Sequence, residues 1–233
     1  VIIVDFTFEP FMKMHEVADV SKTLTWIDHH ITSFQEYVKH PFPCMGLRRI
    51  GTAACELTWN YYFPDKPVPH GLKLIASWDV HDLEYSDDIV PLQYGARAIK
   101  DLYDPTNALW AKGIFDYPAF VNKIIKEGKI ILGYVEAEHA KIMKLYSFEG
   151  NFLGHRAIMV NRGSMNSKAF ESVYDPKNHD IMLAFARTPY GDWSVSIYTD
   201  KDDIDVSQIA KEQGGGGHKQ AAGFQTKHLW FLE

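Results

Sequence analysis

The chain has 233 residues, of which 46% are hydrophobic and 23% charged, proportions that are typical of a globular protein with a sizeable core. Its formal net charge is −6, and no Lys/Arg-rich run is present. This balance excludes a protein that wraps long duplex nucleic acid, because too few cations are available to neutralise many phosphates. The composition does not exclude a protein that acts on a short phosphorylated substrate.

Membrane and secreted proteins are not favoured either. No apolar run approaches the roughly 18 residues of a membrane span, and no signal peptide is visible. The two cysteines, Cys44 and Cys55, form neither a CxxC pair nor a disulfide framework. We therefore expect a cytoplasmic protein without a membrane partner.

Residues 1–30 predict the strand–helix–strand order of an open α/β sheet. The segment VIIVD (1–5) predicts a fully buried parallel strand that ends at Asp5, and EPFMKMHEVA after it has helical spacing. TLTWIDHH (23–30) predicts a second strand. Because the chain opens inside a strand and without an initiator Met, we expect further residues upstream.

The middle of the chain is predicted to be helical. GTAACELTWNYYF (51–63) is a helix with Thr52 as a candidate cap, and the segment 70–88 starts as a helix before it becomes acidic and irregular. Helical periodicity from 117 to 148, interrupted around Gly128 and Gly133, predicts a helical connector.

Short strands dominate after Gly150. HRAIMVN, DIMLAFAR and WSVSIYT are separated by turn signals, and DVSQIAKEQ predicts a helix capped by Asp205 or Ser207. GGGGHKQAAGF (214–224) follows it. We therefore predict a first domain at 1–116, a connector at 117–149 and a second domain at 150–233.

The triplet Asp28-His29-His30 places three polar side chains where a strand ends. In parallel α/β sheets, ligands bind at the carboxyl ends of the strands, and Asp5 ends the other strand. Carboxylates and imidazoles together are ligands for Mn²⁺, Fe²⁺ or Zn²⁺. The alternative is an incidental pair of histidines at a strand end.

The four glycines Gly214 to Gly217 are a second candidate site. Successive backbone N–H groups can converge on an anion, and a helix that followed would add its positive end. His218 could donate to a phosphate oxygen, and Arg162, in the strand-end segment VNRGSMNSK, could lie over an anionic substrate. The alternatives are a flexible linker for the glycines and an ordinary polar loop around Arg162.

Together, DHH early in the chain and GGGGH with AAGF near its end resemble the DHH phosphoesterase superfamily, in particular its members with a DHHA1-type second domain. The resemblance covers most of the chain. It implies an α/β protein in which a parallel-sheet DHH domain is joined to a smaller α/β DHHA1 domain, with the substrate in a cleft between them.

The resemblance also implies roles for individual residues. Asp5 and His29 would bind metal, as would Asp79, with Asp82 as the fallback. His30 would act near the substrate, and Asp28 would orient the histidines. The substrate's phosphate would be bound by Gly214, Gly215, Gly216, Gly217 and His218.

One departure from the family is the absence of its first motif, an HxDxD-like cluster, which we expect upstream of Val1. With it, the family uses two metals, here expected to be Mn²⁺, with Mg²⁺, Co²⁺ or Zn²⁺ as substitutes. The implied activity is metal-dependent hydrolysis of short oligonucleotides or nucleotide phosphates, by a monomer or a homodimer. The alternatives are an exopolyphosphatase or pyrophosphatase, and a catalytically silent nucleotide-binding module if the first motif is missing.

Overall fold

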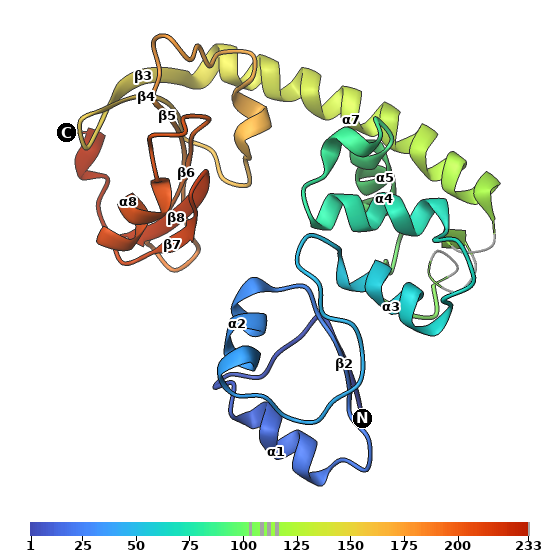
Figure 1. The fold of residues 1–233 in the computed structure, drawn as a ribbon. Helices are drawn as coiled ribbons and strands as arrows, with labels where there is room; N and C mark the ends of the chain where they lie inside the picture. The colour runs from blue at the N-terminus through green and yellow to red at the C-terminus, as the bar shows by residue number, and fades with distance from the viewer. Residues whose placement is uncertain (103, 108–109, 111–112, 115–116, 233) are drawn as a thin grey trace. The chain divides into compact units, whose positions relative to one another are not determined.

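The computed structural model describes residues 1–102, 104–107, 110, 113–114 and 117–232. Its chain divides into two compact units, Val1–Leu132 (unit 1) and Gly133–Glu233 (unit 2), which we describe one at a time (Figure 1). Both combine helices with a sheet, so the predicted fold class, α/β, is confirmed. The predicted domain boundaries remain a prediction.

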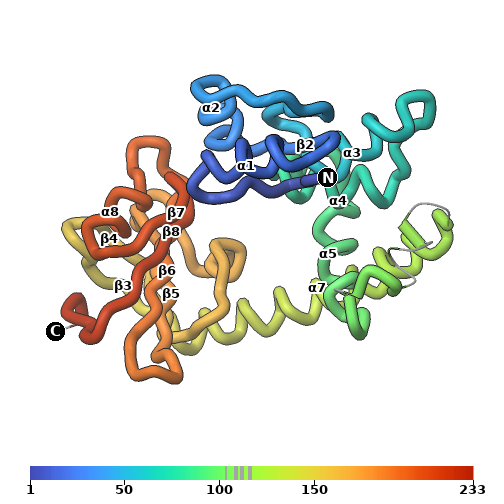
Figure 2. Tube along the Cα trace, turned by 90° about the horizontal axis from the view of Figure 1, so that it is seen from below, coloured from blue at the N-terminus to red at the C-terminus, as the bar shows by residue number. Residues whose placement is uncertain are grey.

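Unit 1 begins with the predicted strand–helix–strand order. Strands β1 (Ile2–Val4) and β2 (Thr25–Ile27) are parallel, and helix α1 (Lys13–Val20) connects them. The trace in Figure 2 shows α1 and α2 (Ile31–Lys39) beside β2, where Trp26 is fully buried against the aromatic ring of Tyr37.

The prediction that β1 is fully buried is wrong. Only its central residue Ile3 is buried, whereas Ile2 is 62% exposed. The reason is the order of the strands: within the described residues β1 pairs with β2 alone, while Thr25 of β2 is also bridged to Met45. An apolar run therefore identified the strand but not its position at an edge.

Beyond residue 53, the described part of unit 1 is mainly helical. Helix α3 begins at Ala54, so its N-cap position is Ala53, which makes no side-chain capping bond. The predicted cap at Thr52 is therefore wrong. The cores of the unit gather around Trp26 and around Leu74. Its described elements include α3 (Ala54–Tyr62), α4 (His70–Asp79), a 3₁₀ turn (Leu83–Tyr85) and α5 (Ile89–Arg97).

Helix α7 (Pro118–Tyr146) is continuous, so the predicted interruption around Gly128 and Gly133 is wrong. Position 128 of α7 requires glycine because α5 crosses the helix closely there. A Cβ at Gly128 would lie 1.8 Å from the carbonyl oxygen of Pro91. In the same way, a Cβ at Gly95 of α5 would lie 2.2 Å from the carbonyl oxygen of Ile124 in α7. No helix within the described residues combines the length and apolar character needed to cross a bilayer.

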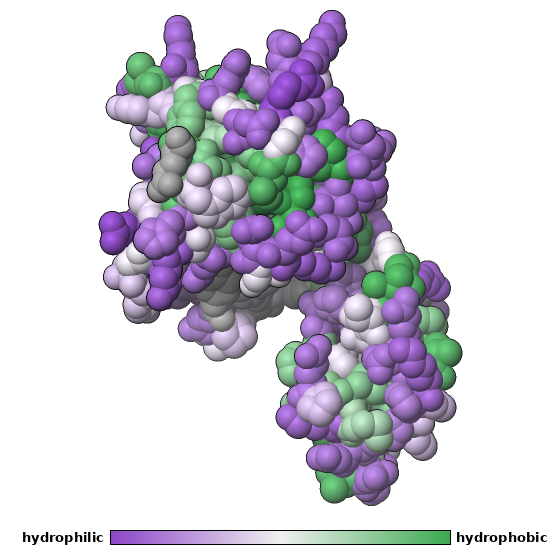
Figure 3. Space-filling view, turned by 90° about the vertical axis from the view of Figure 1, so that its left-hand side faces the viewer, coloured by the Kyte–Doolittle hydropathy of each residue, from purple (hydrophilic) through white to green (hydrophobic). Residues whose placement is uncertain are grey.

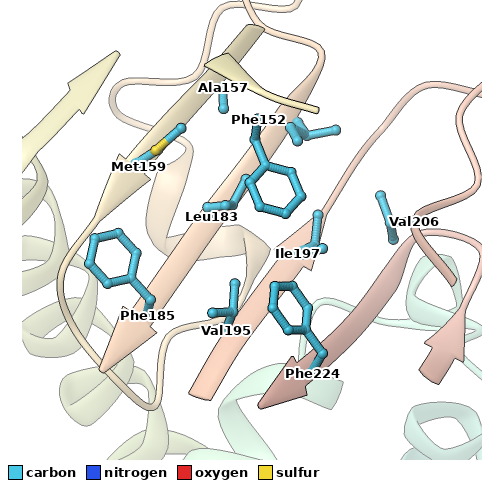
Figure 4. Close-up of a cluster of buried hydrophobic side chains, with 10 residues drawn as sticks. Phe152, Ala157, Met159, Leu183, Phe185, Val195, Ile197, Val206 and Phe224 are labelled. Atoms are coloured by element: carbon cyan, nitrogen blue, oxygen red, sulfur yellow. The ribbon is translucent and has the colours of Figure 1, made fainter. Parts of the chain in front are cut away.

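Unit 2 is built on a six-stranded sheet in the order β3-β4-β5-β6-β8-β7. Phe152, Leu183 and Phe224 gather on one face of it (Figure 4), where Val206 of helix α8 (Val206–Glu212) also packs. Met143, near the end of α7, belongs to a second core cluster. The strands are β3 (Ser147–Phe152), β4 (His155–Val160), β5 (Ile181–Arg187), β6 (Trp193–Tyr198), β7 (Gly216–His218) and β8 (Ala221–Thr226).

Three of these strands match the predicted segments, whereas β3, β7 and β8 were not predicted.

The surface view in Figure 3 shows mainly hydrophilic residues on the visible face, with apolar patches among them. Several large apolar side chains are exposed in the described residues, Tyr190 at 94% among them.

Candidate functional site

The ends of β1 and β2 bring Asp5 next to the histidine pair. The two strands are parallel, with Ile2 paired to Thr25 and Val4 to Ile27. The segments that follow them therefore leave the sheet at the same edge. Asp5 has a left-handed backbone (φ 56°), and its N–H donates to the carbonyl of Ile27 over 2.9 Å. His30 then occupies the N-cap position of α2.

His29 lies between two carboxylates from separate parts of unit 1. Its Nε2 is 3.2 Å from Oδ1 of Asp5 and 3.3 Å from Oδ2 of Asp79, the last residue of α4. The His29 side chain is 13% exposed, while the two carboxylates are about half exposed, at 50% and 43%. The structure therefore brings together the three predicted metal ligands, and it does so with Asp79 rather than the fallback Asp82.

Asp28 is buried beneath this group and is hydrogen-bonded on both oxygens. Its Oδ1 is 2.7 Å from Nδ1 of His30 and accepts the backbone N–H of His29, also at 2.7 Å. Its Oδ2 accepts the hydroxyl of Thr7 at 2.9 Å. A carboxylate that is 2% exposed cannot contact a substrate, but it fixes the ring of His30, as the predicted orienting role requires.

These contacts shift the pKa values of the group. Burial raises the pKa of Asp5, and the nearby carboxylate of Asp79 adds to the effect. Burial alone would also raise the pKa of Asp28, but the hydrogen bonds from His30, Thr7 and His29 outweigh it and lower the pKa. The same bond to Asp28 raises the pKa of His30.

The donor set fits a divalent metal ion. Asp5, His29 and His30 each offer a ligand atom, and these atoms lie within 4.8 Å of one another. Asp79 adds a second carboxylate next to His29. Two carboxylates with imidazole nitrogens suit Mn²⁺, Fe²⁺ or Zn²⁺, so the residues present fit the metal that the sequence predicts.

Two residues of this region were not singled out from the sequence. Thr7 ties the loop after β1 to Asp28, and its Oγ1 is also 2.8 Å from the hydroxyl of Ser33. Arg49, an exposed cation in a small pocket with His29 and His30, is held by its backbone N–H, which donates to the carbonyl of Asp28. The only sequence signal for Arg49 was the pair of arginines before the predicted helix at 51–63.

The glycine segment of unit 2 has a different structure from the predicted anion nest. The N–H of Gly214 donates to the carbonyl of Lys211 and that of Gly215 to Ala210, at 3.0 and 2.8 Å. With φ +78° at Gly214, this is the Schellman ending of helix α8. The predicted nest is therefore wrong for these two N–H groups. Strand β8 follows the segment, so no helix there adds its positive end.

Gly216, Gly217 and His218 form strand β7, and His218 is exposed. A pocket of about 420 Å³ lies over Gly214 and Gly215, so the surface of the segment is accessible. Substrate binding here remains a prediction.

Arg162 follows β4 and is exposed; its charge adds to burial in lowering the pKa of His139. In the sheet order, β4 and β7 are four strand spacings apart, about 19 Å. The structure therefore does not bring Arg162 to the glycine segment.

No protein-family model matches the chain. A curated relative, an uncharacterized protein of Acanthamoeba polyphaga mimivirus, is 30% identical over 240 residues, which cover 96% of this chain but 52% of that protein. The chain therefore spans about half the length of the relative it matches.

Two solved structures are similar to the chain in fold. A pGpG-specific phosphodiesterase from Vibrio cholerae matches with a TM-score of 0.56 at 14% identity, covering 88% of this chain and 75% of that one. The DHH domain of a protein that belongs to a family of ribosomal proteins matches with a TM-score of 0.51 at 17% identity, covering 97% of this chain and 65% of that one.

Proposed function

We propose that this chain, which has the fold of DHH-domain proteins, is a metal-dependent phosphohydrolase that acts on short oligonucleotides or nucleotide phosphates. For the fold, the two structural likenesses confirm the resemblance that the DHH and glycine motifs indicated. For the activity, the carrying observation is the position of His29 between the carboxylates of Asp5 and Asp79.

Asp5, His29 and Asp79 would hold the metal, and a divalent ion bound there would polarise a phosphoryl oxygen and offset the charge that develops on it. The chain's own residues would orient the substrate. Asp28 holds His30 through Nδ1, which leaves the other ring nitrogen of His30 to contact the phosphate or the leaving group. Arg49, which lines a small pocket with both histidines, would add a cation near the phosphate.

The test is hydrolysis by the full-length protein with Mn²⁺, using oligoribonucleotides of a few residues, a nucleoside 3′,5′-bisphosphate, inorganic polyphosphate and long duplex DNA. We expect the short nucleotides to be cleaved well ahead of the duplex, because a net charge of −6 attracts a long polyanion poorly. Phosphate release from polyphosphate at a higher rate than from any nucleotide would favour the exopolyphosphatase alternative. No hydrolysis of any of these would refute the proposal and favour the silent binding module.

Two variants separate binding of metal from use of substrate. His29→Ala should abolish Mn²⁺ binding, measured by calorimetry, together with activity. His30→Ala should retain at least one bound ion and lose turnover, because Nδ1 of His30 is committed to Asp28. Wild-type rates in His29→Ala would contradict the assignment of the two histidines.

Phosphate binding by residues 216–218, whose segment follows the glycines that end α8, is a separate part of the proposal. A Cβ at Gly216 meets no atom within 4 Å, so Gly216→Val should fold normally and obstruct only a ligand that lies against the segment. We expect a raised KM for the phosphorylated substrate. Gly133→Val, which also has open space around its Cβ, is the matched control. An unchanged KM in Gly216→Val would contradict phosphate binding by this segment.

A further inference from the structure

The loop after β1 and the first half of α2 enclose a pocket of about 480 Å³ in unit 1. It opens beside Asp5 and His30, which belong to the candidate metal site. A substrate whose phosphate is held at that site therefore has an adjoining pocket for the group attached to the phosphate.

The wall of the pocket is fixed to the site by hydrogen bonds. The indole Nε1 of Trp26 donates to the carbonyl of Phe6 at 3.2 Å, and the hydroxyl of Thr7 donates to Asp28. Asp5, Phe6 and Thr7 are consecutive and all line the pocket, and Asp5 also belongs to the metal site. Their positions are set by hydrogen bonds to β2 and to the residue that follows it.

The charge in the pocket is negative away from the site. Glu9 and Glu36 line it, and among the residues that the structure describes no Lys or Arg does. Lys39 bonds to Glu36 at 2.6 Å and lowers its pKa, so Glu36 is a carboxylate at neutral pH. Carboxylates accept hydrogen bonds from hydroxyl and N–H groups and repel further phosphates.

The pocket also presents an aromatic surface. Phe6 is 51% exposed, and its ring packs edge-to-face on Phe8, with centroids 4.9 Å apart and planes at 88°. Phe8 is itself packed against the core around Trp26. A braced ring with an exposed face is a stacking platform for a nucleobase. Trp78, by contrast, packs in the helical core of unit 1.

We infer that this pocket binds the nucleoside of the substrate, with its base stacked on Phe6 and its ribose hydroxyls or base N–H groups bonded to Glu9 and Glu36. The inference rests on the proposed function, because the phosphate is taken to lie at Asp5 and the histidines. It narrows the substrate class to phosphorylated nucleosides. A polyphosphate chain would place a second anion against two carboxylates, in a pocket that no cation of the described residues lines.

The test compares equilibrium binding of a nucleoside monophosphate and of inorganic tripolyphosphate, by calorimetry, in wild type and variants. Phe6→Ala should weaken the nucleotide at least about tenfold, the usual effect of removing a stacked aromatic, and leave tripolyphosphate unchanged. Glu9→Lys should tighten tripolyphosphate and weaken the nucleotide. Tyr190→Ala, which removes an aromatic ring that is 94% exposed in unit 2, is the control and should change neither.

Unchanged nucleotide binding in Phe6→Ala, equal weakening of both ligands, or a wild type that binds no nucleotide would each overturn the inference. Retained Mn²⁺ binding in the variants shows that the site is folded, and a variant that loses it is replaced by Phe6→Leu. If wild-type protein binds the nucleotide with this pattern but hydrolyses nothing, the proposed function fails and the nucleoside pocket stands.

Discussion

Two glycines of helix α7 should respond in opposite ways to the same substitution. Gly128→Ala would place a Cβ 1.8 Å from the carbonyl oxygen of Pro91, whereas ordinary contact begins at 3.4 Å. The obstacle is backbone, so no side-chain rotation relieves it and α5 must move by about 1.6 Å. Gly133→Ala meets no atom within 4 Å.

The expected free energies follow from these contacts. Alanine is favoured over glycine inside a helix by about 1 kcal/mol. At Gly133 that gain should appear as higher stability. At Gly128 overpacking of about 3 kcal/mol outweighs it, which leaves a net loss of about 2 kcal/mol. The two variants should therefore differ by about 3 kcal/mol although they make the same change on one helix.

Urea denaturation followed by circular dichroism measures this difference. The Gly128→Ala variant should unfold at a lower urea concentration than wild type, and the Gly133→Ala variant at an equal or higher one. Because Gly128 belongs to unit 1, an earlier and separate transition of that unit would agree with the reasoning. Equal or greater stability of Gly128→Ala than wild type would show that α5 and α7 do not cross as described.

Other predictions concern unit 2 and the metal. Arg156 holds the pKa of Asp180 at about 2, below the ordinary 3.8, so the bond stabilises the fold above pH 4 and its effect is lost as the pH falls toward 2. Asp180→Asn should therefore lower Tm by a few degrees at pH 7 and match wild type near pH 2. Asp205→Ala removes the capping bond to the N–H of Ser207 and should lower Tm, whereas Asp203→Ala serves as a control without it. Treatment with EDTA should abolish hydrolysis and Mn²⁺ should restore it; full activity after chelation would refute metal dependence.

The sequence by itself determined the local elements and the chemistry they carry. Apolar runs predicted β1, β2 and the strands β4, β5 and β6 of unit 2, because alternation and strand length are local properties. The capping candidates for α8 were Asp205 and Ser207, and the structure assigns the role to Asp205, whose carboxylate accepts the N–H of Ser207. The polar ends of two parallel strands also predicted that Asp5 and the histidines would meet.

Only the tertiary structure decided what depends on neighbours distant in the chain. The end of α4 at Asp79 turns that carboxylate toward His29, and no periodicity distinguishes it from Asp82. Gly214 and Gly215 satisfy the carbonyls at the end of α8, so their N–H groups are not free for an anion. A backbone N–H that already donates within the fold is not available to a ligand, and which partner takes it depends on packing that a short motif does not contain.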